Sequence, residues 1–265
     1  MFSIADTHCH LDFDAFNGDR DAVISRARDA GIVRILNPGV DINSSCMAIE
    51  LAENYDEVFV ACGVHPNDAL SWDDETQRTL KRIVKHPKVV AIGEIGLDYY
   101  RNRAPRDLQM QILNQQLALA TEVGLPVVVH SRQAADDTLD LISVWHANLV
   151  ASGSPLAEQP GVLHSFSGDR EVARRAIDLN FMIGITGPIT YPNADDLRQT
   201  VSSIPISALL VETDAPFLTP QPRRGERNEP AYVAWVVEKI AEIHNLPAQI
   251  VMELTTANSY NIFHW

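Results

Sequence analysis

Short apolar runs alternate with longer amphipathic segments along the whole chain. The runs are rich in Val and Ile and almost continuously apolar, which is typical of parallel strands covered on both faces. They predict eight strands, at residues 3–6, 34–36, 58–62, 89–92, 127–129, 162–163, 181–185 and 209–211.

The segments between the runs have helical spacing and recognisable helix ends. Gly31 and Gly124 stand where the first and fourth of these segments stop, and glycine there favours a helix C-terminus. The pattern predicts helices at residues 19–30, 43–54, 73–86, 106–123, 134–147, 170–179, 193–202 and 230–244, with an extra C-terminal helix at 247–262.

Eight alternations of strand and helix predict an α/β fold with a parallel sheet. The number eight favours a closed (β/α)8 TIM barrel over an open doubly wound sheet, and no glycine-rich nucleotide loop follows an early strand. A length of 265 residues suits one such barrel, so we predict a single domain over residues 1–265. Residues 148–160 are the loosest stretch; we expect a tolerated insertion at the rim opposite the active site.

Composition narrows the class of protein. The net charge of −14 argues against a non-specific nucleic-acid coat, although a locally positive, metal-loaded pocket could still handle phosphodiesters. We expect no membrane span and no signal peptide, and we infer no stable protein partner. Cys9, Cys46 and Cys62 cannot all pair, so we interpret them as reduced thiols of a cytoplasmic protein.

Metal-type ligands follow the predicted strands. The carboxyl ends of barrel strands form the active site, and five of the nine histidines stand there: His8, His10, His65, His130 and His164. Glu94 and Asp214 belong to the same rim. Imidazoles and carboxylates without a thiolate suit Zn²⁺, Mn²⁺ or a related ion.

His8-Cys9-His10 is the most informative motif. Side chains alternate faces in extended backbone, so His8 and His10 share one side while Cys9 turns into the core. Two imidazoles about 7 Å apart along one face can converge on a single ion.

The number of ligands suggests two ions that share Glu94. One ion would take His8, His10 and Asp214, and the other His130 and His164. Such a pair, about 3.5–4 Å apart, would clamp the attacking and leaving oxygens and lower the pKa of a water between them. Asp214 could accept the proton of that water. A single ion, with His65 as a spare ligand, is the alternative.

For three further features of the rim, the sequence allows either a functional or a structural role. His65 could donate to a substrate oxygen or be structural. Arg132 could bind a phosphate or form a rim ion pair. The loop 223–230, which contains Arg227, could supply local positive charge or be a solvated loop. We expect Glu212 to be a buried support, and Asp98 and Tyr99 could line the mouth.

Seven motifs together carry a family resemblance. They are Thr-His-Cys-His-Leu-Asp (7–12), Gly-Val-His-Pro (63–66), Gly-Glu-Ile-Gly-Leu-Asp-Tyr (93–99), Val-His-Ser-Arg (129–132), His-Ser-Phe-Ser-Gly (164–168), Glu-Thr-Asp-Ala-Pro (212–216) and Arg-Asn-Glu-Pro (227–230). The chain resembles the TatD-like metal-dependent deoxyribonucleases, which are amidohydrolase-type barrels. The segment 148–160 looks longer than is usual in that family.

The resemblance implies a hydrolase that cuts phosphodiester bonds in DNA, in many members from the 3′ end, with divalent metal. DNA ends or oligonucleotides would be the substrate and two ions of Zn, Mn or Mg the cofactor. It implies metal roles at His8, His10, Glu94, His130, His164 and Asp214. From the arrangement of ligands we expect Glu94 and Asp214 to be catalytic as well. The resemblance also suggests substrate contacts at His65, Arg132 and Arg227.

Two other functions remain open at this point. A hydrolase of a small ester, amide or aminoacyl substrate could use the same ligands, because fold and metal do not fix the substrate. A closed apolar mouth would favour it, whereas basic loops favour phosphate. A non-catalytic barrel is the third possibility, but six buried ligands are costly to keep without a partner.

Overall fold

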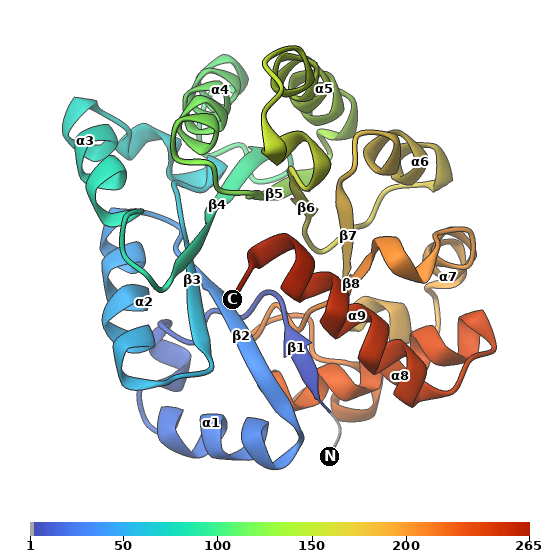
Figure 1. Ribbon diagram of the computed structural model, residues 1–265. Helices are drawn as coiled ribbons and strands as arrows, with labels where there is room; N and C mark the ends of the chain where they lie inside the picture. The colour runs from blue at the N-terminus through green and yellow to red at the C-terminus, as the bar shows by residue number, and fades with distance from the viewer. Residues whose placement is uncertain (1–2) are drawn as a thin grey trace.

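The computed structural model describes residues 3–265, in which eight parallel strands stand in consecutive order around a barrel (Figure 1). The strands are β1 (Ile4–Asp6), β2 (Ile32–Pro38), β3 (Val58–Cys62), β4 (Val89–Asp98), β5 (Val127–Arg132), β6 (Gly161–Leu163), β7 (Met182–Ile185) and β8 (Leu209–Val211). The predicted (β/α)8 TIM barrel is confirmed, and every predicted run falls on a strand.

Helices alternate with the strands and form the outer layer (Figure 1). They are α1 (Arg20–Asp29), α2 (Ile42–Asn54), α3 (Asp74–Ile83), α4 (Arg106–Val123), α5 (Ala135–Ala151), α6 (Arg170–Asp178), α7 (Asp195–Val201), α8 (Val233–His244) and α9 (Ala248–Phe263). The extra C-terminal helix is therefore present. One difference is that Pro230–Tyr232 forms a 3-10 turn before α8 begins.

The first and last strands close the ring beyond their own ends. The backbone N–H of Thr7 donates to the carbonyl of Val211 at 3.1 Å. A parallel bridge then joins Cys9 to Ala215. These bonds bring the segments after β1 and β8 together, and both segments carry predicted metal ligands.

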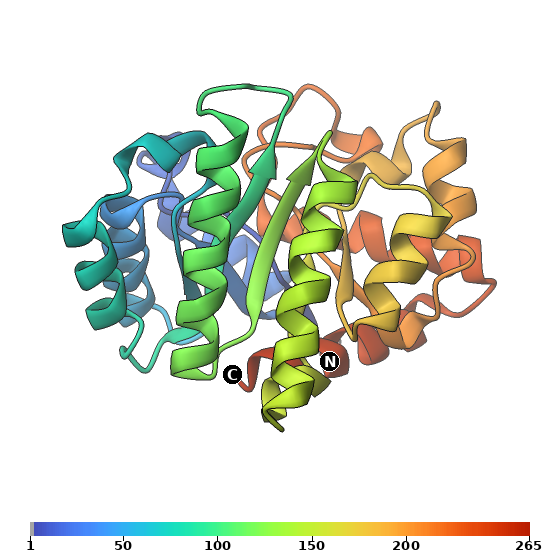
Figure 2. The ribbon, with the colours of Figure 1, turned by 90° about the horizontal axis from the view of Figure 1, so that it is seen from above.

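Helix α9 closes the end of the barrel opposite the strand tips (Figure 2). Its Ile262 and Phe263 pack into the apolar interior of the barrel with residues from six strands: Leu36, Ala61, Val90, Ala91, Val128, Val162 and Leu210. The side chain of Asn258 donates to the carbonyls of Ile206 and Leu209 at 2.8 and 2.9 Å. The barrel interior below the strand tips, where the predicted metal ligands lie, is therefore filled with apolar side chains.

Residues 148–160 lie at the α9 end, as predicted, but they are not loose. Helix α5 continues to Ala151, and a 3-10 turn follows at Pro155–Glu158. The carbonyl of Ala157 lies 3.1 Å from Nε2 of His146 and accepts from Asn180 at 3.0 Å. Helix α5 therefore runs four residues past its predicted end at residue 147, and these two bonds hold the segment that follows it.

The expectations for membrane spans and for the cysteines, both drawn from the composition, have the following outcomes. Within residues 3–265, no helix combines the length and the hydrophobicity that a membrane crossing needs. Cys9, Cys46 and Cys62 are all free thiols, and Cys9 is fully buried in the core, as predicted.

Candidate metal centre

Five imidazoles and two carboxylates meet at the strand tips. β4 and β5 contain Glu94 and His130, whereas the others follow strand ends: His8 and His10 after β1, His65 after β3, His164 after β6 and Asp214 after β8. β1 stops at Asp6, so His8 and His10 lie past the strand rather than in it. Their Nε2 atoms still stand only 3.2 Å apart, on the same side.

Glu94 lies between two sets of imidazoles. Its Oε2 is 3.4 Å from Nε2 of His8 and 3.7 Å from Nε2 of His10. Its Oε1 is 2.9 Å from Nδ1 of His130 and 3.3 Å from Nε2 of His164. Each carboxylate oxygen therefore faces its own pair of nitrogens, which is the arrangement that a bridging ligand requires.

Asp214 completes the His8–His10 side. Its Oδ1 is 3.8 Å from Nε2 of His8 and 3.6 Å from Nε2 of His10. The backbone there is left-handed, with φ 55°, a region in which aspartate is enriched. Its N–H donates to the carbonyl of His8 at 2.8 Å, so the turn holds the carboxylate over the two imidazoles.

In His10 and His130, the ring nitrogen that points away from Glu94 has a hydrogen-bond partner. In a neutral ring, this partner decides whether the other nitrogen, which faces Glu94, carries the lone pair. Nδ1 of His10 is 3.2 Å from the carbonyl of Pro38, and Nε2 of His130 is 3.2 Å from Oδ2 of Asp98. A carbonyl or carboxylate only accepts, so each of these two nitrogens must donate. Nε2 of His10 and Nδ1 of His130 are therefore free to ligate, in the pattern that orients metal-bound histidines.

Glu212 supports His164 from behind. Its Oε2 lies 3.4 Å from Nδ1 of His164 and accepts from the N–H of Ser165 at 2.9 Å. The hydroxyl of Thr7 donates to Oε1 at 3.4 Å. Glu212 is fully buried, and its expected role as a hydrogen-bonded support agrees with these contacts.

In His65, unlike in His10 and His130, the nitrogen that points away from Glu94 accepts a hydrogen bond. Its Nδ1 accepts from the N–H of Asn67 at 3.0 Å, so the proton of the neutral ring lies on Nε2. That Nε2 stands 3.5 Å from Oε1 of Glu94. Burial lowers the pKa of His65 to about 3, which keeps the ring neutral. His65 is thus placed to donate a hydrogen bond, and this disfavours the alternative in which it is a spare ligand.

The donor set fits divalent cations. Donor atoms cluster in three overlapping groups: His8, His164 and Asp214; His8, His10 and Glu94; and His65, Glu94 and His130. The third group includes Nε2 of His65, which carries a proton, so the other donors are the candidate ligands. Ligands at about 2.0–2.1 Å around a tetrahedral ion stand about 3.3 Å from one another, close to the spacings here. The buried Nδ1 atom of His8 has no partner in residues 3–265.

Both carboxylates are held ionised. Burial alone would raise the pKa of Glu94, but the surrounding imidazoles, above all His164, keep that pKa well below its usual range. Burial likewise opposes ionisation of Asp214, yet the nearby imidazoles of His10, His164 and His8 lower its pKa. Two ionised acids among lone-pair nitrogens form a site for cations.

Asp98 has a role that the sequence analysis missed. β4 runs on to Asp98, six residues past the predicted end, and its carboxylate also accepts from the N–H groups of Tyr100 and Arg101 at 3.0 and 2.8 Å. The spacing of four from Glu94 was the available signal, because residues i and i+4 of a strand share a face. Asp98 fixes the orientation of His130.

Asp98→Asn should lower the affinity for metal by about 10–100-fold, because a neutral amide orients and polarises His130 less well. Titration of Mn²⁺ or Zn²⁺ against a competing chelator measures this affinity. Asp136→Asn, on the exposed first turn of α5, is the control. Wild-type affinity in Asp98→Asn would remove the positioning role.

The two arginines predicted at the rim differ in what they contact. The guanidinium of Arg132 lies 4.2 Å above the ring of Tyr100, and no acid within residues 3–265 pairs with it. Arg227 instead donates to both carboxylate oxygens of Asp19, at 2.7 and 2.8 Å, and to the carbonyl of Ala15. The geometry therefore favours a loop-holding role for Arg227, and its substrate contact stays a prediction.

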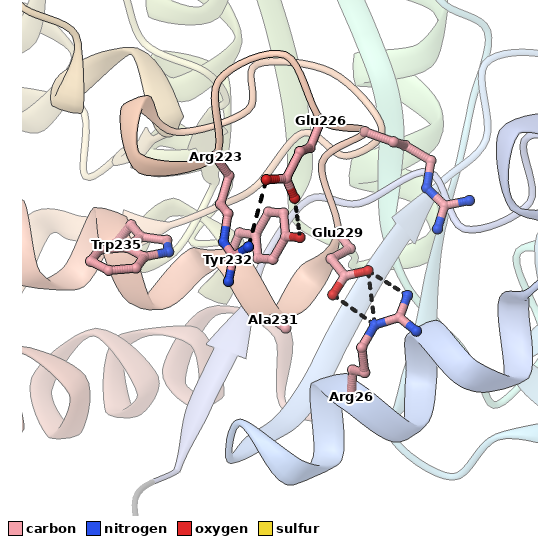
Figure 3. A pocket seen from close by; sticks show the side chains of 8 residues that line it. Arg26, Arg223, Glu226, Glu229, Ala231, Tyr232 and Trp235 are labelled. Carbon is pink, nitrogen blue, oxygen red and sulfur yellow. Dashed lines mark hydrogen bonds and ion pairs between the residues drawn. The ribbon is translucent and has the colours of Figure 1, made fainter.

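A hollow of about 730 Å³ lies beside the same loop, apart from the ligands (Figure 3). Arg26 forms an ion pair with Glu229 at 2.6 Å across it, and Glu226 accepts from the hydroxyl of Tyr232 at 3.1 Å. Two of the three arginines of loop 223–230 are paired with acids, Arg223 with Glu226 and Arg227 with Asp19, whereas Arg224 stacks on the ring of Tyr191. The loop provides less local positive charge than its sequence suggested.

Arg227→Ala and Asp19→Asn should have the same consequences if Arg227 holds the loop. We expect each to lower the free energy of unfolding by about 1 kcal/mol or less, with no further loss in the double variant. Chemical denaturation measures these energies, and initial rates give the Michaelis constant. A Michaelis constant raised only in Arg227→Ala would identify a direct substrate contact.

The barrel and its rim of imidazoles and carboxylates define a class of protein, the (β/α)8 barrels with a candidate metal centre at the strand tips. The match of residues 5–264 to the model of the TatD related DNases identifies the family more closely. The chain belongs to this TatD family.

Related proteins align with this chain over nearly its whole length. The "Uncharacterized metal-dependent hydrolase YabD" of Bacillus subtilis is 40% identical over 97% of this chain and 98% of its own. The "3'-5' ssDNA/RNA exonuclease TatD" of Erwinia tasmaniensis is 36% identical over 100% of both chains. The crystal structure of YjjV, a TatD homolog from Escherichia coli, is 34% identical with a TM-score of 0.91, covering 99% of this chain and 98% of that one.

Proposed function

We propose that this protein is a divalent-metal-dependent hydrolase that cleaves phosphodiester bonds in DNA, removing nucleotides from the 3′ end. The observation that carries the proposal is the position of Glu94, whose two oxygens face separate pairs of imidazole nitrogens. The exonuclease name of one relative at 36% identity supports the choice of bond. We further propose that residues 1–265 act as one domain, and that it works in the cytoplasm, where free thiols persist.

The chain would hold two ions of Zn, Mn or Mg. His8, His10 and Asp214 would bind one and His130 and His164 the other, with Glu94 shared. When bound, such ions polarise phosphoryl oxygens and lower the pKa of an attacking water.

Three side chains would then act on the substrate. The carboxylate of Asp214, ionised and partly open to solvent, would accept the proton of the water. The Nε2–H of His65 would donate to a phosphate oxygen, because its tautomer makes it a donor. Arg132 would bind a neighbouring phosphate through the edge of its guanidinium.

Hydrolysis of a small ester or amide would use the same ligands, but Arg132 favours phosphate. Its guanidinium is exposed, stacked on Tyr100 and not neutralised by an acid in residues 3–265. A small neutral amide has no use for such a group outside the centre.

End-labelled oligonucleotides test the proposal. The protein, loaded with Zn²⁺, Mn²⁺ or Mg²⁺, is incubated with single-stranded DNA labelled at the 5′ or the 3′ end, and then with model amides. We expect a ladder of shortened products from the 5′ label, early mononucleotide from the 3′ label, and no reaction with a chelator. Amide cleavage with intact DNA would contradict the proposal.

A further inference from the structure

Two exposed aromatic side chains lie on opposite sides of the centre. Phe217, after β8, has 51% of its surface exposed, and Tyr100, after β4, has 57%. The strands run consecutively around the ring, so the loops after β4 and β8 face each other across the mouth. None of the chemistry above uses the ring of Phe217.

The backbone of Phe217 is fixed while its ring is left in solvent. Its N–H donates to the carbonyl of Asp214 at 2.8 Å, and its carbonyl accepts from the buried side chain of Asn228 at 2.6 Å. The ring lies 6.5 Å from His10 and 6.0 Å from Phe13 between centroids. Phe13 stacks on His10 at 4.5 Å. Aromatic faces therefore lead from the centre to the solvent on this side.

The opposite side is cationic. The N–H of Tyr100 donates to Asp98 at 3.0 Å, and Asp98 in turn contacts His130, so this loop is also tied to the centre. Stacking of Arg132 on the ring leaves the N–H edge of the guanidinium open to a phosphate.

We propose that Phe13 and Phe217 form a platform on which the terminal base of the substrate stacks, while Arg132 and Tyr100 grip a phosphate of the remaining strand. The inference rests on the proposed function, which places the scissile phosphate at the centre between them. An uncharged aromatic surface suits a base, because every base has a π face, and a guanidinium suits the charged backbone.

Binding of non-hydrolysable oligonucleotides tests the platform without requiring cleavage. Phosphorothioate-linked strands that end either in a normal nucleotide or in an abasic residue are titrated by fluorescence anisotropy with Mg²⁺ present. We expect wild type to bind the base-ended strand about tenfold more tightly. Phe217→Ala should lose this preference, and Phe217→Trp should keep it.

The control is Tyr260→Ala, on α9 at the far end of the barrel, which should keep the full preference. Each variant is compared with itself on two strands, so partial misfolding does not imitate the result. A wild type without preference, or Phe217→Ala with an unchanged preference, would overturn the platform. Arg132→Ala should weaken both strands equally and reduce the salt slope by about one phosphate contact; an unchanged affinity would overturn the phosphate grip.

The same protein variants also show whether a failure lies in the stacking platform or in the proposed function. Hydrolysis of bis(4-nitrophenyl) phosphate needs only the centre, so its failure removes the proposed function while the binding series still decides on the platform. Placing the abasic residue at the 3′ or the 5′ end shows which end stacks. A preference at the 5′ end alone would support the platform and contradict 3′ to 5′ digestion.

Discussion

Glu94→Gln should lower the turnover of metal-dependent hydrolysis by about 10³-fold or more, which corresponds to about 4 kcal/mol of lost transition-state stabilisation. Glutamine keeps the size of the side chain but removes the charge that faces five imidazoles. Both ions would lose their common ligand at once. Steady-state kinetics on a labelled oligonucleotide measures the effect, and elemental analysis gives the metal content.

Glu57→Gln is the matched control, because Glu57 is also buried and paired, with Arg28, but lies just before β3, at the end away from the strand tips. It should affect stability more than turnover. Wild-type turnover in Glu94→Gln at wild-type metal content would exclude a bridging role for Glu94.

His10→Ala and His130→Ala should each remove one ion and leave the other. His10 faces Oε2 of Glu94, whereas His130 faces Oε1, so the two substitutions act on different sides of the shared carboxylate. We expect turnover to fall by about 10²-fold or more in each, since both attacking and leaving oxygens need stabilisation. Elemental analysis after reconstitution would give about one ion per chain in each variant.

His146→Ala controls for loss of an imidazole as such, because His146 lies on α5, where its Nε2 is 3.1 Å from the carbonyl of Ala157, and not at the strand tips. It should retain full metal content. If one substitution removes all metal while the other removes none, the protein has a single site, and the two-ion interpretation is wrong.

The sequence predicted the barrel because eight near-continuous apolar runs alternate with helical segments along the chain. Parallel strands of a barrel bring their carboxyl ends to one rim. The sequence therefore predicted that His8, Glu94 and Asp214 meet, although up to 206 residues separate them. Hydrophobic patterning did not predict where β4 ends. Gly96 has φ +140° and lies against the carbonyl of His130 where no side chain fits, so the strand continues past the apolar run that predicted it.

Individual hydrogen bonds were beyond prediction from the pattern. The bond of Asn67 to His65 decides whether that ring donates or ligates, and a backbone N–H leaves no signature in the sequence. The pairing of Arg227 with Asp19 joins residues 208 apart, through a loop whose composition only indicated positive charge. Such contacts depend on tertiary packing, and they separate a substrate contact from a structural ion pair.

Anomalous diffraction from a crystal soaked in Mn²⁺ or Zn²⁺ tests the central claim most directly. We predict two peaks about 3.5–4 Å apart, one on each side of the Glu94 carboxylate, one beside His10 and Asp214 and the other beside His130 and His164. A map with no peak at the strand tips, or with one peak that contacts neither oxygen of Glu94, would contradict the account.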